Sequence, residues 1–189
     1  DRRARAYIGR VTDVQRAMSD LRVSYDSPPL RRADLAADPL TQFRAWFAAA
    51  VEGGVPEPNA MTLATSTADG DVSARTVLLK DVGPRGFVLY SNLESRKGRD
   101  LADNPRAALV FPWLPLHRQV VVTGEVSLVT RGEVAQYFGS RPRDSQLGSA
   151  ASRQSTVLAG REELDARFAE LSRRHPAGSP VPVPAHWGG

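Results

Sequence analysis

The sequence predicts a mainly β domain with flanking helices, in the form of an antiparallel barrel. Its middle contains short segments of alternating apolar residues, separated by turn residues at 68–71 and 83–86, which is typical of antiparallel strands. Few helical segments alternate with these strands, so the pattern disfavours a parallel sheet. With 189 residues, 41% of them hydrophobic, the chain is long enough to bury a core. We therefore treat residues 1–189 as a single domain, in which residues 1–38 form an N-terminal helix and a wrapping loop.

Helices are predicted on both sides of this β region. Residues 1–25 carry apolar side chains at helical spacing among arginines, which indicates a peripheral amphipathic helix. Residues 26–35 are rich in Pro, Asp and Arg and are expected to form a surface loop. A buried helix is predicted from Pro39 to Glu52, because Asp38 is a favourable N-cap and a proline fits the first turn.

The remaining elements follow from alternation, caps and apolar spacing. Strands are predicted at residues 61–65, 72–80, 87–91, 107–112 and 118–128. Helices are predicted from the Ser95 cap towards residue 104, from the capping box of Thr130 and Glu133 through residue 138, and around residues 164–171. Residues 176–184 are rich in proline and are expected to be extended.

Composition excludes several classes of function. The chain has no cysteine, which excludes disulfides, thiolate metal sites and a cysteine nucleophile, and favours a cytoplasmic location. No apolar run approaches the roughly 20 residues of a membrane span, so no membrane partner is expected. The charge of +4 and the 7% of aromatic residues do not indicate a nucleic-acid partner. No metal site is assigned, because the three histidines lack ligand spacing.

The two lysines are the first indication of a binding site. Lys80 and Lys97 are the only lysines among 25 basic residues. Arg96 and Lys97 follow the Ser95 cap, so they lie at a helix N-terminus, where free N–H groups favour an anion. An ammonium and a guanidinium bind anions in different ways, so an arginine near each lysine suggests a polyanionic small ligand. Taken alone, the same residues also fit a solvated surface.

A series of short motifs lies along the chain at residues 75–80, 90–92, 95–97, 111–113, 118–120, 137–138, 140–146, 154–155 and 187–189. Any one of them is weak, but the ordered set resembles the pyridoxamine 5'-phosphate oxidase family over most of the chain from residue 22 onward. The resemblance implies an antiparallel split β-barrel homodimer with FMN at the subunit interface. It also implies oxidation of pyridoxamine or pyridoxine 5'-phosphate to pyridoxal 5'-phosphate, with O2 as acceptor and H2O2 as product, in vitamin B6 salvage or biosynthesis.

The resemblance assigns binding residues one by one. It implies that FMN is contacted by Arg75, Thr76, Val77, Leu78, Leu79, Lys80, Tyr90, Ser91, Arg96, Lys97, Gln119, Gln154, Ser155 and Trp187. It implies that the substrate is contacted by Lys80, Tyr137, Arg141, Ser145, Arg22 and Tyr25. No residue is assigned as a catalytic acid or base, so Lys80 and Arg141 are expected to act by positioning, while the cofactor carries the redox chemistry.

Several alternatives stay open beside the oxidase. Residues 141–146 also fit a polar surface loop, and a split-barrel flavoprotein with another substrate is the second hypothesis. The resemblance implies a further segment, with an Arg, a His and a second Arg, beyond residue 189. If the chain ends at residue 189, a non-catalytic binder of FMN or pyridoxal phosphate is the third hypothesis, and if it continues, the oxidase stands; a nucleic-acid module is the last hypothesis. Ser149 and Ala150 stand where the family resemblance implies a larger aromatic residue, so the pocket wall is expected to differ there.

Overall fold

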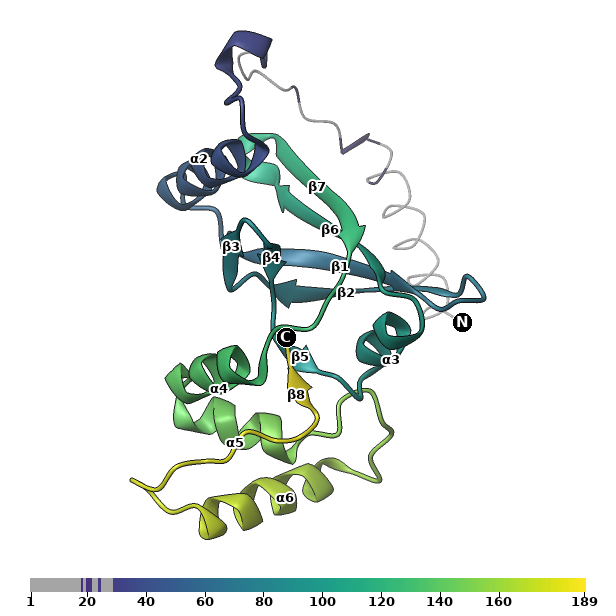
Figure 1. Cartoon of the computed structure of the whole chain (residues 1–189), viewed down its shortest axis with the longest axis vertical. Helices are drawn as coiled ribbons and strands as arrows, with labels where there is room; N and C mark the ends of the chain where they lie inside the picture. Colours follow the sequence, from purple (N-terminus) through teal and green to yellow (C-terminus); the bar gives the residue numbers. More distant parts are fainter. Residues whose placement is uncertain (1–17, 19, 22–23, 25–28) are drawn as a thin grey trace, which may run out of the picture. The chain divides into compact units, whose positions relative to one another are not determined.

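The computed structural model describes residues 18, 20, 21, 24 and 29–189. The chain divides into two compact units, Asp1–Leu35 and Ala36–Gly189. Arg22 and Tyr25, with most of the predicted N-terminal helix, lie outside the described residues. In the first unit, a short 3-10 helix, η1, spans Arg32–Asp34 within the segment predicted to be a loop. The second unit contains all the described strands (Figure 1).

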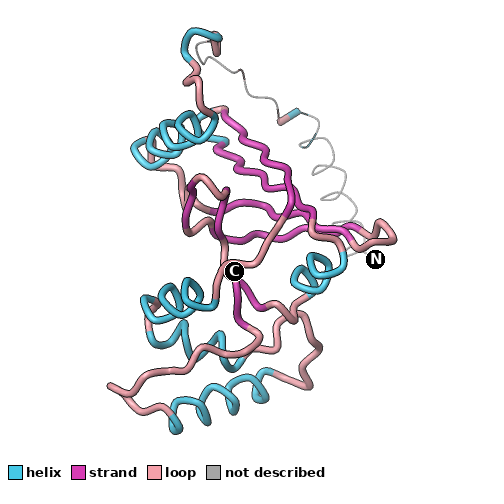
Figure 2. The backbone as a smooth tube through the Cα atoms, in the orientation of Figure 1, coloured by secondary structure: helices cyan, strands magenta, loops and turns pink. Residues whose placement is uncertain are grey.

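The largest sheet of the second unit is antiparallel, as the sequence predicts. Its order is β2-β1-β6-β7, with β1 at Ala60–Ser66, β2 at Val72–Leu78, β6 at Arg106–Trp113 and β7 at Arg118–Glu125 (Figure 2). Leu63 of β1 lies opposite Arg75 of β2 on one side and Leu109 of β6 on the other. The predicted turn between the first two strands is tight, and Gly70 adopts a φ of 91° there, which glycine allows without strain.

Two further antiparallel pairs accompany the large sheet among the described residues. One joins β3, Asp81–Gly83, to β4, Gly86–Val88, and the other joins β5, Ser91–Asn92, to β8, Trp187–Gly188. The sequence predicts one strand at 87–91, and that prediction is wrong in detail. The segment breaks after β4 because β5 pairs with β8, a partner almost 100 residues later. Alternation within a segment carries no information about such a distant partner.

The predicted helix starts after Asp38, Ser95 and Thr130 are confirmed. The helices are α2 at Pro39–Glu52, α3 at Arg96–Asp103, α4 at Arg131–Ser140, α5 at Arg143–Ala151 and α6 at Arg161–Arg174. The Asp38 carboxylate accepts a hydrogen bond from the Thr41 N–H at 2.7 Å. The Ser95 hydroxyl caps α3, and Thr130 and Glu133 form the predicted capping box of α4.

The structure adds one helix to the predicted set. Residues 141–146 fit a polar loop in the sequence, but α5 begins at Arg143, with Pro142 as its N-cap and Asp144 in its first turn. An acidic residue in the first turn stabilises a helix, because its negative charge interacts favourably with the helix dipole. Arg141, the C-cap of α4, and Ser145, in the first turn of α5, therefore flank the short corner between the two helices.

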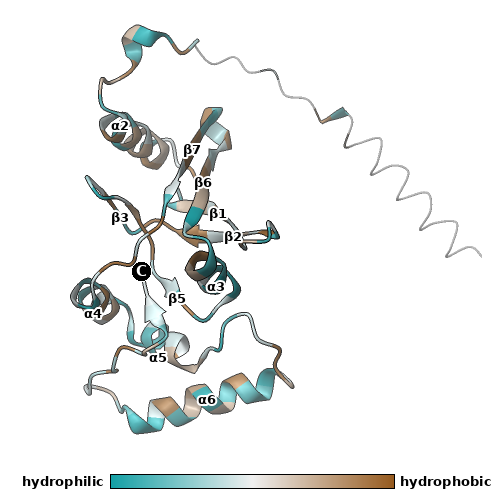
Figure 3. Ribbon diagram, turned by 45° about the vertical axis from the view of Figure 1, so that its right-hand side comes forward, coloured by the Kyte–Doolittle hydropathy of each residue, from teal (hydrophilic) through white to brown (hydrophobic). Residues whose placement is uncertain are grey.

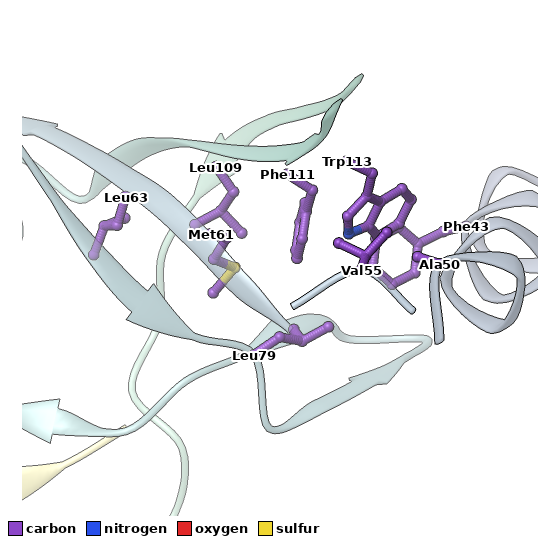
Figure 4. Packing of buried hydrophobic residues seen from close by; sticks show 9 residues of the cluster. All are labelled: Phe43, Ala50, Val55, Met61, Leu63, Leu79, Leu109, Phe111 and Trp113. Carbon is purple, nitrogen blue, oxygen red and sulfur yellow. The ribbon is translucent and has the colours of Figure 1, made fainter. Parts of the chain in front are cut away.

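One hydrophobic core lies between α2 and the large sheet. Its buried residues are Phe43, Ala50, Val55, Met61, Leu63, Leu79, Leu109, Phe111 and Trp113 (Figure 4). The Phe43 ring meets the Phe87 and Phe111 rings edge-on at 4.8 and 5.0 Å, a favourable aromatic geometry. The Trp113 indole N–H donates to the Pro58 carbonyl at 2.9 Å, so its polar atom is satisfied inside the core.

A second, smaller hydrophobic core lies among the C-terminal helices of the unit. It consists of Val134, Phe138, Leu147, Val181 and Trp187, and it joins α4 and α5 to the extended tail and β8. The outermost helix, α6, is mainly hydrophilic and has no buried residue (Figure 3). Among the described residues, no helix combines the length and the apolar character that crossing a bilayer requires.

Candidate functional site

A cavity of about 740 Å³ lies where β2, α3, α4, α5 and β8 meet. Its volume is within the range of about 300–1,000 Å³ that is usual for small-molecule sites. It is lined by Ser73, Ala74, Arg75, Thr76, Val77, Leu78, Lys80, Tyr90, Ser91, Arg96, Lys97, Tyr137, Arg141, Pro142, Ser145, Gln154, Ser155 and Trp187. This lining contains basic, hydroxyl and aromatic side chains but no carboxylate and no histidine.

The cavity brings together every predicted binding residue within residues 29–189 except two. Leu79 packs in the first core, and both its backbone N–H and its carbonyl bond to Asn59. Gln119 lies exposed on β7, opposite Pro112. The sequence reasoning missed Ser73, although it lies two residues from Arg75 on the same strand, and period-two spacing places the two side chains on one face.

Arg75 is held by three hydrogen bonds inside the unit. Its Nη1 donates to the Leu63 carbonyl at 3.1 Å and to the Thr65 hydroxyl at 2.8 Å. Its Nη2 donates to the Ser73 hydroxyl and lies 3.8 Å from the Asp100 carboxylate. Burial lowers the pKa of the Arg75 guanidinium, and the Asp100 charge opposes that shift. The group stays charged, because a guanidinium does not lose its proton in proteins.

Lys97 is buried beside the α3 N-terminus, with 7% of the residue exposed. Its Nζ donates to Ser91 Oγ at 3.0 Å, Ser95 Oγ at 3.1 Å and Gln154 Oε1 at 2.6 Å. Burial, followed by the charge of Arg75, lowers the pKa of this ammonium. An ammonium has three donors, so the three acceptors satisfy it, and an anion would have to share or displace one of them.

Three aromatic rings stack at the other end of the cavity. Tyr90 and Tyr137 lie 4.1 Å apart with 13° between their planes, and Trp187 lies 5.6 Å from Tyr90 and 5.9 Å from Tyr137. Burial raises the pKa of the Tyr90 hydroxyl, so it stays protonated at neutral pH. The stack forms a flat apolar surface beside the basic residues.

Two cations lie over this stack. Lys80 Nζ is 5.9 Å from the centre of the Tyr137 ring, and the Arg141 guanidinium carbon is 4.8 Å from the Trp187 ring. These distances are typical of cation–π contacts. Arg141 Nη1 also donates to the hydroxyl of Ser149 at 2.7 Å, the position where a larger aromatic residue was expected. Burial lowers the pKa of Arg141, and the guanidinium remains charged.

The backbone around Trp187 explains why glycines follow it. The Trp187 carbonyl accepts a hydrogen bond from Arg131 Nη1 at 2.7 Å. A Cβ at Gly188 would lie 2.7 Å from the Leu93 side chain, and one at Gly189 would lie 2.5 Å from the Tyr90 ring. A side chain at either position would force Leu93 or Tyr90 to move, so the two glycines permit the close packing of this segment.

Metal binding has no support in the described part of the chain. No group of three or more His, Cys, Asp or Glu side chains gathers there in a way that could hold a metal ion. The fold and the cavity define a mainly β protein with flanking helices and a pocket in which basic side chains lie beside aromatic rings.

Sequence comparison identifies the family. Residues 47–175 match the family model described as pyridoxamine 5'-phosphate oxidase. The chain is 55% identical over 170 residues to a pyridoxine/pyridoxamine 5'-phosphate oxidase of Frankia alni, with 89% of this chain and 70% of the relative covered. It is 51% identical over 173 residues to the enzyme of the same name from Streptomyces avermitilis, with 89% and 77% covered. The chain belongs to the pyridoxamine 5'-phosphate oxidase family.

Solved structures share the fold. PhzG from Burkholderia lata, in complex with tetrahydrophenazine-1-carboxylic acid, is 30% identical with a TM-score of 0.80, and the match covers 88% of this chain and 81% of PhzG. A pyridoxamine 5'-phosphate oxidase-related, FMN-binding protein from Nostoc punctiforme has a TM-score of 0.63 at 13% identity, with 82% and 80% covered, and shows the same fold. The family membership supports FMN as the cofactor, as the sequence predicts.

Proposed function

We propose that this chain oxidises pyridoxamine 5'-phosphate and pyridoxine 5'-phosphate to pyridoxal 5'-phosphate with FMN as cofactor, O2 as acceptor and H2O2 as product. One observation carries the proposal. A single cavity is lined by one group of cations that act on one another, Arg75 with Arg96 and Lys97, and by a second group over the stacked rings, Lys80 over Tyr137 and Arg141 over Trp187. Two groups of cations fit two phosphates, one on the cofactor and one on the substrate.

The first group fits the phosphate of FMN. Arg75 offers a forked guanidinium, and Arg96 lies at the N-terminus of α3, where the helix dipole and free N–H groups attract an anion. Gln154, held by Lys97, can bond to the polar edge of a ring system without adding charge. When bound, FMN supplies the two-electron acceptor for the substrate carbon that bears the amine or alcohol.

The second group fits the phosphate of the substrate. Lys80 and Arg141 supply charge, and Tyr137 and Ser145 supply hydroxyls in the same cavity. Because the lining contains no carboxylate or histidine, we assign these residues to positioning and not to proton transfer. Correct positioning of the reacting atoms alone accounts for several orders of magnitude in rate in many enzymes.

We further propose that two copies of the chain form a homodimer with FMN at their interface. The outer face of β2 is exposed and largely apolar, with Val72 79% and Leu78 36% exposed, and Leu78 also lines the cavity. Gln119 lies outside the cavity of its own chain and would complete the site of a second copy. Light scattering tests this proposal, since a 20.5 kDa monomer that retains FMN would contradict it.

The reaction is tested by anaerobic reduction of the FMN-loaded protein with pyridoxamine 5'-phosphate. We expect the flavin absorbance to bleach and then to recover when O2 is added, with formation of hydrogen peroxide and pyridoxal 5'-phosphate. A flavin that stays oxidised with both phosphorylated substrates would contradict the proposed reaction. It would leave the second hypothesis, a flavoprotein with another substrate, and the third, a binder of FMN or pyridoxal phosphate.

A second candidate function has one observation in its favour. The PhzG structure contains a polycyclic carboxylic acid, and the ring stack with Arg141 above Trp187 also fits a flat, carboxylate-bearing ligand. The same anaerobic assay discriminates between the two functions. Bleaching by a reduced polycyclic carboxylate, without bleaching by pyridoxamine 5'-phosphate, would favour this second function.

A further inference from the structure

A buried carboxylate lies behind Arg75. Asp100 is on α3, and its side chain is only 5% exposed. One of its oxygens, Oδ2, accepts hydrogen bonds from the Thr65 hydroxyl at 2.6 Å and from the Ser73 hydroxyl at 2.8 Å. The carboxylate does not line the cavity, and the proposed reaction assigns it no role.

The two hydroxyls link this carboxylate to Arg75. A hydroxyl has one proton and two lone pairs, so each hydroxyl that donates to Asp100 can accept from Arg75. Thr65 accepts from Nη1 at 2.8 Å and Ser73 accepts from Nη2. The two hydroxyl oxygens lie 3.2 Å apart, and together they receive the end of the guanidinium that carries both Nη atoms.

This arrangement determines which edge of Arg75 is available. Both N–H groups of Nη1 are used, by Leu63 and Thr65, and one N–H of Nη2 is used by Ser73. In the described part of the chain, the Nε–H and the second Nη2–H have no hydrogen-bond acceptor. These two parallel donors form the side edge of the guanidinium, which matches two oxygens of a phosphate.

Asp100 also balances the local charge. The charge of Arg96 lowers the pKa of Arg75, and the charge of Arg75 lowers the pKa of Lys97, because like charges repel. The hydrogen bonds from Thr65 and Ser73, with the charges of Arg96 and Arg75, hold the pKa of the Asp100 carboxyl below its usual range. Asp100 is therefore negative at neutral pH.

We propose that Asp100 is a positioning residue for phosphate recognition, which orients Thr65 and Ser73 so that Arg75 presents its side edge to the FMN phosphate. The inference rests on the proposed binding of FMN. It assigns no contact between Asp100 and the ligand. Its effect is expected on the phosphate of the cofactor and not on the flavin ring.

The test compares the affinity of the purified protein for FMN and for riboflavin, which lacks the phosphate, by flavin fluorescence quenching. We expect Asp100→Ala to weaken FMN binding about tenfold and to leave riboflavin binding within about twofold. Asp100→Asn and Ser73→Ala should each weaken FMN binding about threefold, because each removes part of the linkage. Asp103→Asn is the matched control, since Asp103 is an exposed acid on the same helix, and it should change neither affinity.

A double-mutant cycle with Arg75→Ala shows whether Asp100 acts through Arg75. In the Arg75→Ala background, Asp100→Ala should cause no further loss of FMN affinity. Equal losses for FMN and riboflavin, or full additivity in the cycle, would overturn the inference. If Asp100→Ala does not fold, the ratio of FMN affinity to riboflavin affinity is measured instead in Ser73→Ala and in Asp100→Asn.

The outcome is separable from the proposed reaction. A protein that shows the expected pattern of affinities but is not reduced by pyridoxamine 5'-phosphate would contradict the reaction and keep the role of Asp100. A protein that is reduced by the substrate, and whose preference for FMN over riboflavin is unchanged in all three variants, would contradict the role of Asp100 and keep the reaction.

Discussion

The two ends of the cavity hold their cations in different ways. At one end, Arg75 makes three hydrogen bonds to Leu63, Thr65 and Ser73, with a buried carboxylate behind them. At the other end, Arg141 lies on the face of Trp187 with a single hydrogen bond to a side chain, and Lys80 is exposed over Tyr137.

This difference separates a fixed binding group from an adaptable one. Hydrogen bonds depend steeply on angle, so the guanidinium of Arg75 has one preferred orientation before any ligand binds. Contacts with ring faces constrain a cation less strictly. A pre-organised group lowers the cost of binding and would suit a cofactor that stays bound, whereas a less constrained group would suit a substrate that must enter and leave.

The largest expected effect is on Trp187, the ring that supports Arg141. Trp187 is 5% exposed, and its replacement by alanine should lower the free energy of unfolding by about 3–5 kcal/mol. Urea unfolding of the apoprotein measures this loss. Trp187→Phe is the control, because it retains a ring and should lose less. A loss below about 1 kcal/mol for Trp187→Ala would mean that the adaptable end does not depend on its aromatic surface.

Arg75 is expected to have the next largest effect. Arg75→Ala should weaken FMN binding by about 10–100-fold, since it removes charge-assisted hydrogen bonds. Arg75→Lys should recover little affinity, because an ammonium cannot supply the paired donors of the fork. Arg106→Ala, which removes an exposed arginine of β6, is the control and should bind FMN as the wild type does. Full recovery by Arg75→Lys would contradict a fixed orientation.

The fold was predictable from the sequence where the signals are local. The helix starts follow from caps such as Asp38 and Ser95, and the large antiparallel sheet follows from alternation. The pairing of β5 with β8 was not predictable, because it depends on residues far apart in the chain. α5 was missed because Arg, Asp, Ser and Gln are common in loops as well as in helices.

The residues that line the site were more predictable from the sequence than the residues that support them. Motif order pointed to the basic and aromatic residues that line the cavity, while their roles in binding stay predictions. The supporting residues Thr65 and Asp100 carried no motif, and only the three-dimensional structure brings them to Arg75. Leu79 also stood within a motif, yet strand alternation turns its side chain into the core.

Arg141 gives the sharpest contrast with Arg75. Arg141→Ala should raise KM for pyridoxamine 5'-phosphate about tenfold with little change in FMN affinity, because it removes one charged contact to the substrate phosphate. Arg141→Lys should keep most of the affinity, since contacts with ring faces are tolerant of geometry. Arg161→Ala, an exposed arginine of α6 paired with Asp165, is the control.

The two ends are compared by the fold-change in each variant, which is the loss of FMN affinity for the Arg75 variants and the rise in KM from steady-state kinetics for the Arg141 variants. If the lysine variants of Arg75 and Arg141 lose the same fraction of affinity for their ligands, the distinction between a fixed and an adaptable end is wrong. If Arg141→Ala uses the phosphorylated substrate as well as the wild type does, Arg141 is not part of the substrate site.

The smallest expected effect concerns the ion pair that ties α4, the helix carrying Tyr137, to the β3–β4 turn. The hydrogen bond from Arg85, followed by those from the Thr130 cap, lowers the pKa of Glu133 to about 2. A carboxyl group with a depressed pKa stabilises the folded state above its unfolded pKa of about 4.5 and loses that contribution as the pH falls towards 2. The pair is exposed, so the effect is small.

The measurement is the melting temperature of wild type and Glu133→Gln between pH 6 and about 3. We expect the wild type to lose slightly more stability over this range than the variant, with the difference concentrated below about pH 4.5. Glu162→Gln, at an exposed position in the first turn of α6, is the control and should follow the wild type. If Glu133→Gln has the same pH profile as the wild type, the charge of Glu133 in the cap and the ion pair does not stabilise α4. The adaptable end of the cavity would then be stabilised by ring packing alone.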